Sequence, residues 1–310
     1  MTAIFWKELG DHLGRRRFLL TLFLIVVGVL WGLFILAREV DGSSVTSNEF
    51  LFLRTFTSSS GVLPPVLFYI GFFGPLIGIA LGFDAINSER AQGTLSRLLA
   101  QPIHRDDVFN GKFLAGLVTL TIVLVAMILA IVGLAMFVMG YSPRSEEVVR
   151  LFGFGVLSVV YLAFWLALAM TCSIFFRNAV TSALVSLGLW LLSTFLIALL
   201  VAPALADLIV PAIETAQQKV DHANWQLWLS RISPSQLFNE AAQTLLNPDV
   251  RFTGVLGLER AAQFDRLEAT PISASQSLQL VWPHITVVFS LAASLIAVSY
   301  TKFMREEIRS

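Results

Sequence analysis

The chain has 310 residues, of which 56% are hydrophobic and only 14% charged, whereas an ordinary soluble domain has about a quarter charged residues. Its 21 basic and 21 acidic residues give a formal net charge of zero, which excludes the overall basic character of a nucleic-acid-binding protein. The single cysteine, Cys172, cannot form an intrachain disulfide, and its apolar neighbours indicate a small buried hydrophobic residue.

Long apolar runs divide the chain into six candidate membrane-spanning helices. A helix needs about 20 apolar residues to cross a hydrocarbon layer that is roughly 30 Å thick. Runs of that length occupy residues 18–37, 62–83, 113–140, 151–176, 180–201 and 282–300. Because only Arg177 and Asn178 separate the fourth run from the fifth, these two should form a tight hairpin. The sequence therefore predicts an all-α, polytopic membrane protein, with residues 1–310 forming a single membrane domain.

Lys and Arg in the short loops predict the orientation, because positive residues are retained on the cytoplasmic side. With the N-terminus inside, most basic residues of the short loops are cytoplasmic, and those outside are Arg38, Arg54, Arg144 and Arg150. Both termini are then cytoplasmic, and residues 202–281 form an extracytoplasmic helical segment between the fifth and sixth spans. We expect a multi-pass protein of the cytoplasmic (inner) membrane of a prokaryote.

Residues 1–17 predict an amphipathic helix before the first span. A helical wheel places Phe5, Trp6, Leu9 and Leu13 on one arc and Lys7, Glu8, Asp11 and His12 opposite. A helix of this kind, followed by Arg15, Arg16 and Arg17, is typical of one that lies in the cytoplasmic interface with Trp6 at headgroup depth. Packing on a soluble partner is the alternative, and the two are compatible.

The predicted cytoplasmic loop 84–112 combines turn signals with an apolar ridge. Gly93 can end a first short helix, Thr94 can cap a second, and Pro102 can stop it. This second helix has three apolar residues on one side, Leu95, Leu98 and Leu99. Lying outside the hydrocarbon, the ridge predicts a docking site for a protein partner. The alternative is a loop that packs on its own bundle.

The same loop resembles that of a known family. Its pattern is Glu89 and Gly93-Thr94-Leu95, followed by Leu98-Leu99, Pro102, Arg105 and Gly111-Lys112. This pattern is similar to the coupling helix of type-two ABC transporter permeases. In size and layout the chain is most similar to the permeases of nitrous-oxide-reductase maturation transporters.

The resemblance implies a permease that pairs with a second copy of itself, or with a similar chain, to enclose a pathway. Cytoplasmic ABC ATPase subunits would power it, and export is favoured. Loop motion would then shift the first, second and fifth spans. The implied roles are polar contacts by Glu89, Arg90 and Arg97, a buried ridge of Leu95, Leu98 and Leu99, and loop shape from Gly93 and Pro102.

Two further patterns concern packing. Gly74, Gly78 and Gly82 recur every four residues, which predicts a small face of the second span for helix packing or a dimer contact. In the outer segment, Ser233, Pro234 and Gln236 predict a helix start with a capping box, and Asn247-Pro248 predicts its end. A preceding helix is expected within residues 211–229. The outer helices could cap the pathway, bind an extracytoplasmic partner, or form a simple folded cap.

Absent motifs narrow the function. The chain has no G-x-x-x-x-G-K-[ST] phosphate loop, so ATP would have to be bound by another chain. The four histidines have no metal-ligand spacing, and we expect no metal or other cofactor. We also expect no ionisable residue deep in a span, which argues against ion-coupled transport. A lipid-acting membrane enzyme and a non-transporting scaffold remain alternatives. The adjacent pairs Asp106-Asp107 and Glu146-Glu147 are interpreted as solvated loop charge, or as a helix cap in the case of Asp106.

Overall fold

The computed structural model describes residues 2–14, 23, 27, 30, 50–57, 66–94, 104–140, 142–210, 215–248 and 272–305. These residues form helices and connecting turns only, which confirms the predicted all-α class. The predicted first span, residues 18–37, lies almost entirely outside the described residues, as do Arg15, Arg16 and Arg17.

Five helical segments among the described residues are long and apolar enough to cross a membrane: Val66–Ala91, Arg105–Phe137, Ser145–Phe175, Ala179–Ile209 and Ala274–Arg305. Each overlaps one predicted span. Three of the helices are α7 (Arg105–Met139), α8 (Ser145–Phe175) and α14 (Ala274–Arg305). At 1.5 Å per residue each is roughly 50 Å long, so its ends must extend beyond a hydrocarbon layer of about 30 Å.

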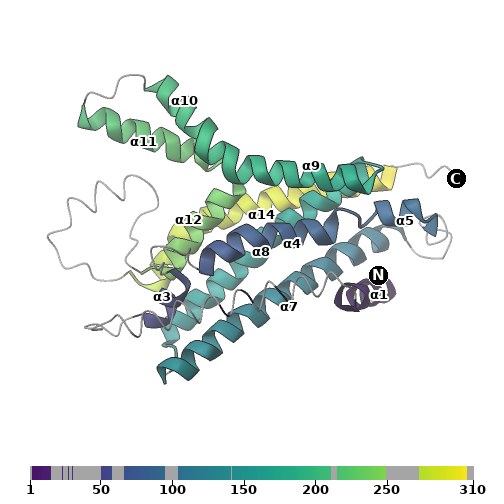
Figure 1. Ribbon diagram of the computed structural model, residues 1–310, viewed down its shortest axis with the longest axis horizontal. Coiled ribbons are helices and arrows are strands. Elements are labelled where there is room, and N and C mark those ends of the chain that lie inside the picture. The colour runs from purple at the N-terminus through teal and green to yellow at the C-terminus, as the bar shows by residue number, and fades with distance from the viewer. Residues whose placement is uncertain are drawn as a thin grey trace.

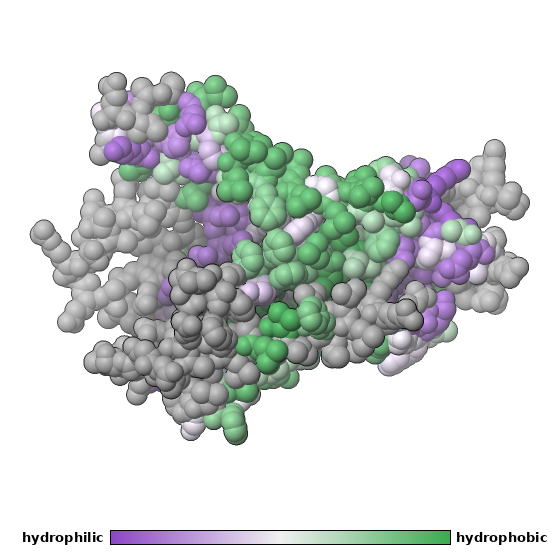
Figure 2. Space-filling view, viewed as in Figure 1, coloured by the Kyte–Doolittle hydropathy of each residue, from purple (hydrophilic) through white to green (hydrophobic). Residues whose placement is uncertain are grey.

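The bundle centre is built on α8. This helix packs against α4 (Val66–Gly82), α7, α12 (Pro234–Leu246) and α14. Its buried side chains include Phe154, Tyr161 and Trp165. Figure 2 shows apolar surface over the middle of the molecule and hydrophilic residues gathered towards its two ends, as expected for a protein that spans a bilayer.

The two ends of the bundle carry different short elements (Figure 1). At one end lie α1 (Thr2–Gly14), α5 (Asn87–Ala91) and the last residues of α14. At the other, α10 (Ala202–Ile209) and α11 (Ala216–Ser230) form a hairpin that extends away from the bundle. The short helix α3 (Leu51–Thr57) packs beside α4, α8 and α12.

The fourth and fifth spans form the predicted tight hairpin. α8 ends at Phe175 and α9 (Ala179–Leu191) begins after Asn178, whose side chain accepts a hydrogen bond from the Val180 amide at 2.9 Å. The fifth span then continues through a π-helical segment, η1 (Leu192–Val201), into α10. π-helical turns are rare and frequently occur at functional sites.

The three spaced glycines lie against α8, which supports intramolecular packing. A Cβ at Gly74 would lie 2.6 Å from Leu162 Cδ2, and one at Gly82 would lie 2.8 Å from Ala169 Cβ. At Gly78 the added atom would lie 3.3 Å from the Leu166 amide nitrogen. The small face therefore lets α4 approach α8 closely.

Some local predictions are wrong in detail. Asp106 lies in the first turn of α7, where a carboxylate suits the helix dipole, but the residue at the cap position is His104. Glu147 is buried rather than solvated: one carboxylate oxygen accepts the Phe52 amide at 3.2 Å and the other the Arg144 amide at 2.9 Å. The solvated-loop interpretation fails for Glu147 because its carboxylate satisfies backbone donors at the start of α3 and α8.

Candidate functional site: the charged junction of α1, α5 and α7

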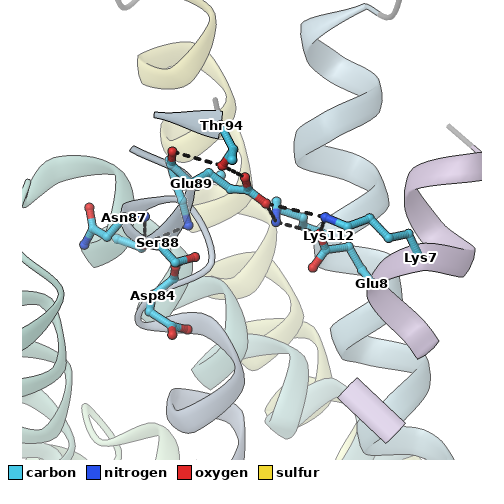
Figure 3. Close-up of polar contacts among 10 residues, drawn as sticks. Lys7, Glu8, Asp84, Asn87, Ser88, Glu89, Thr94 and Lys112 are labelled. Carbon is cyan, nitrogen blue, oxygen red and sulfur yellow. Dashed lines mark hydrogen bonds and ion pairs between the residues drawn. The ribbon is translucent and has the colours of Figure 1, made fainter. Parts of the chain in front are cut away.

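Four charged residues meet where α1 and α5 reach the beginning of α7 (Figure 3). Lys112, on α7, points between two carboxylates: its Nζ lies 2.8 Å from Glu8 Oε1 on α1 and 3.3 Å from Glu89 Oε1 on α5. Lys7 Nζ lies 3.5 Å from Glu8 Oε1 and 3.7 Å from Glu89 Oε1. We call Lys7, Glu8, Glu89 and Lys112 the charged junction. Its two positive and two negative charges alternate.

The junction is largely withdrawn from solvent. The Lys112 side chain is 4% exposed and each of the two carboxylate side chains 12%, whereas Lys7 is 54% exposed. A buried ion pair of this kind is stable only when its charges are paired and hydrogen-bonded. Burial lowers the pKa of the Lys7 ammonium, but the carboxylates of Glu8 and Glu89 outweigh this effect and raise its pKa above the ordinary value.

Apolar packing brings α1 to α7. Ile4 and Leu9 are buried, and Gly111 on α7 lets Ile4 come close, since a Cβ there would lie 3.0 Å from Ile4 Cγ2. Glu8 shares this buried side, although the helical wheel places it on the polar face. Trp6 is 67% exposed, and its position at headgroup depth stays a prediction. The residues of the predicted apolar arc therefore differ in environment, because Leu9 is buried and Trp6 is largely exposed.

Residues of the predicted coupling loop shape α5 itself. The helix ends at Ala91, and Gly93 has a φ of +66°, a left-handed conformation that glycine adopts at no steric cost. The Thr94 hydroxyl donates to the Glu89 carboxylate and to the Glu89 carbonyl oxygen, so it helps fix the acidic side chain that faces Lys112.

The opposite side of α5 is fixed to the end of α8 by reciprocal capping. The Ser173 hydroxyl on α8 accepts the amides of Ile86 and Asn87 at 3.1 and 3.2 Å, where α5 has no side-chain cap of its own. In return, the guanidinium of Arg90 donates to the Ile174 carbonyl oxygen at 3.2 Å, among the last carbonyls of α8. Each helix thus satisfies backbone groups that the other leaves unpaired.

The structure brings together only part of the predicted site. Glu89, Arg90, Gly93 and Thr94 are placed as above, and Arg105 begins α7. The apolar ridge and its neighbours lie outside the described residues: Leu95, Arg97, Leu98, Leu99 and Pro102. Within the described part of the chain, no group of three or more His, Cys, Asp or Glu side chains could hold a metal ion.

A second polar region, which the sequence prediction missed, surrounds α12. The guanidinium of the buried Arg150 donates to the Leu245 carbonyl at 3.0 Å, to the Ser277 hydroxyl at 2.9 Å and to the Ile272 carbonyl, and pairs with Glu146 at 3.2 Å. These bonds link the start of α8 to the end of α12 and the start of α14.

Hydroxyl groups make similar links at the start of α12. The Tyr161 hydroxyl donates to the Gly71 carbonyl at 2.9 Å and lies 3.0 Å from Ser235 Oγ. Ser235 Oγ also lies 3.0 Å from Thr194 Oγ1 in η1. The beginning of α12 is therefore hydrogen-bonded both to the bundle centre and to the π-helical part of the fifth span.

One ionisable residue lies near the end of a predicted span. His284, the third residue of the predicted sixth span, is buried and lies 3.2 Å from Glu240 on α12. Because it lies near the end of that span, the expectation that no ionisable residue lies deep in a span stays a prediction.

These features define a multi-pass helical membrane protein. At one end of its bundle, the short helix α5 is fixed to α1, α7 and α8. The sequence model of the ABC-2 family of transporter proteins matches residues 2–308, and the chain belongs to this family. It is 30% identical over 246 residues to "Probable ABC transporter permease protein NosY" of Pseudomonas aeruginosa, covering 75% of this chain and 77% of that protein. The protein of the same name from Stutzerimonas stutzeri is 28% identical over 238 residues, again covering 75% of this chain and 77% of that protein. The chain is thus a transmembrane permease subunit of an ABC transporter.

Proposed function

We propose that the chain is the pathway-forming subunit of an exporter of the cytoplasmic membrane of a prokaryote, with both termini in the cytoplasm. Two copies, or this chain and a similar one, would enclose the pathway. Separate cytoplasmic ATPase subunits would hydrolyse ATP and dock on residues 84–112. The membership of the ABC-2 family, which works with ABC ATPase subunits, supports this assignment.

The observation that carries the coupling role is the set of contacts made by α5. This five-residue helix is joined to Lys112 on α7 by Glu89, and the same Lys112 is joined to Glu8 on α1. Ser173 and Arg90 link it to α8. A displacement of the loop would move these helices with it, because each link is a hydrogen bond that involves a charged side chain or a backbone group.

The contacts of α5 add to the expected transmission. We expected loop motion to shift the first, second and fifth spans. The second span continues into α5, and the polar contacts of α5 reach α7 and α8, the third and fourth spans. Glu89 and Arg90 were expected to contact the ATPase, but both side chains make intramolecular contacts. We therefore assign them to transmission, and the ridge of Leu95, Leu98 and Leu99 to docking.

The test is Leu98→Asp. Burying a leucine against a partner is worth about 1.5 to 3 kcal/mol before ordering costs, and an aspartate in its place must be desolvated. The ATPase subunit should no longer co-purify with this variant. The matched control is Leu208→Asp, at the far end of the bundle, because Leu208 is 76% exposed and adjoins the exposed Asp207. If Leu98→Asp retains the ATPase and its turnover as the control does, the docking role is wrong.

A further inference from the structure

The helix α12 is too short to span a bilayer but is packed among helices that do. Its 13 residues are about 20 Å long, against roughly 30 Å of hydrocarbon. Phe238, Ala241 and Leu245 have no exposed surface, and the helix contacts α3, α4, α8, α14 and η1. Displacing α12 would therefore open a space between the spanning helices at the end of the bundle opposite the charged junction.

One carboxylate on α12 joins three elements. Glu240 Oε2 accepts Arg231 Nε at 2.9 Å, from the turn before α12, and lies 3.2 Å from His284 Nε2 on α14. Its other oxygen, Oε1, accepts Gln236 Nε2 at 3.3 Å. Gln236 thus bonds Glu240 instead of completing the predicted capping box, while the Ser233 hydroxyl caps the helix by accepting the Gln236 amide at 3.4 Å.

The hydrogen bond to Glu240 involves one of the two ring nitrogens of His284. A carboxylate can only accept, so Nε2 must carry the proton that points to Glu240. The other ring nitrogen, Nδ1, is buried and has no hydrogen-bond partner among the described residues. The contact is thus a hydrogen bond from the His284 imidazole to a carboxylate that also accepts from the Arg231 guanidinium.

We propose that Glu240, Arg231 and His284 form a latch that holds α12 against the sixth span, and that this latch opens when α12 moves during transport. Arg231 and Glu240 fix α12 to the α11 hairpin, and Glu240 and His284 fix it to α14. The movement during transport rests on the proposed function. The latch itself does not.

The latch can be tested with a buried reporter on α12. Ala241 has no exposed surface, so in a Cys172→Ala background the thiol of Ala241→Cys should react with a maleimide only when α12 moves away. In the detergent-purified permease, Glu240→Gln and His284→Leu should each raise the labelling rate at least tenfold. His284→Gln, which keeps an N–H donor, should restore slow labelling.

Two controls separate opening of the latch from other changes. Gln243→Glu alters charge on the exposed side of α12 and should leave labelling slow. A second reporter, Ser182→Cys on α9, is fully buried and should stay unreactive unless the whole bundle unfolds. If Glu240→Gln and His284→Leu label at the rate of the Gln243→Glu control, the latch is refuted. Equal labelling of His284→Gln and His284→Leu would also refute it, because the hydrogen bond would then be irrelevant.

The movement has its own test in the complex with the ATPase. Addition of ATP should accelerate labelling of Ala241→Cys when the latch residues are intact. An unchanged rate, in a complex whose ATPase co-purifies and turns over, would refute the movement while leaving the docking assignment in place. Loss of co-purification would instead count against the proposed function.

Discussion

Replacement of Lys112 by methionine tests the charged junction directly. Methionine is similar in volume but removes the cation that lies 2.8 Å from Glu8 and 3.3 Å from Glu89. Two opposite charges about 4 Å apart attract by roughly 4 kcal/mol at an effective dielectric constant near 20. Removing one partner of a buried pair costs about 3 to 5 kcal/mol, because the other charge is left uncompensated. Since Lys7 remains 3.5 and 3.7 Å from the two carboxylates and each of these keeps 12% exposure, we expect the lower end, about 3 kcal/mol.

The measurement is thermal unfolding of the detergent-purified permease. A loss of about 3 kcal/mol corresponds to a fall in Tm of roughly 6 to 12 °C for a chain of a few hundred residues. Lys219→Met, on the exposed surface of α11, is the matched control and should change Tm little. Adding Glu8→Gln to Lys112→Met should recover part of the loss, because one unpaired carboxylate is removed. A Lys112→Met variant that melts with the control would refute the reasoning.

The sequence predicted the elements whose signals are local. Span positions followed from apolar runs, and the start of α12 followed from Ser233 and Pro234, whose backbone preferences act within one turn. Gly93 could be predicted as a helix-ending residue for the same reason. The three glycines of α4 predicted a close helix contact, and the structure identifies the partner as α8.

The candidate site depended on contacts between residues far apart in the chain. Glu8 and Lys112 are 104 positions apart, and Arg150 and Ser277 are 127 apart. A helical wheel assumes that apolar residues face inward and charged residues outward. Glu8 is charged and faces inward, because its partner arrives from another helix. No local pattern marks such a residue.

Three further predictions concern other contacts of the bundle. Gly82→Ala should destabilise the detergent-purified permease by about 1 to 3 kcal/mol, because the added methyl overlaps α8, whereas Gly188→Ala has no atom within 4 Å and should not lower Tm. Burial by itself raises the pKa of the Glu240 carboxyl, but the His284 hydrogen bond and the Arg231 guanidinium hold that pKa below its ordinary value. The stabilisation by the ionised Glu240 is therefore present above the ordinary pKa and lost as the pH falls through the lowered pKa. Glu240→Gln should thus lose less Tm than the wild type on acidification from about pH 6 to about pH 3. Arg150→Lys should lower Tm by several degrees although the positive charge is kept. The guanidinium uses both terminal nitrogens to reach two carbonyls, one hydroxyl and one carboxylate, and a single ammonium with three donors cannot serve all four. A lysine variant as stable as the wild type would show that the positive charge alone, and not the geometry of the planar guanidinium, joins α8 to α12 and α14.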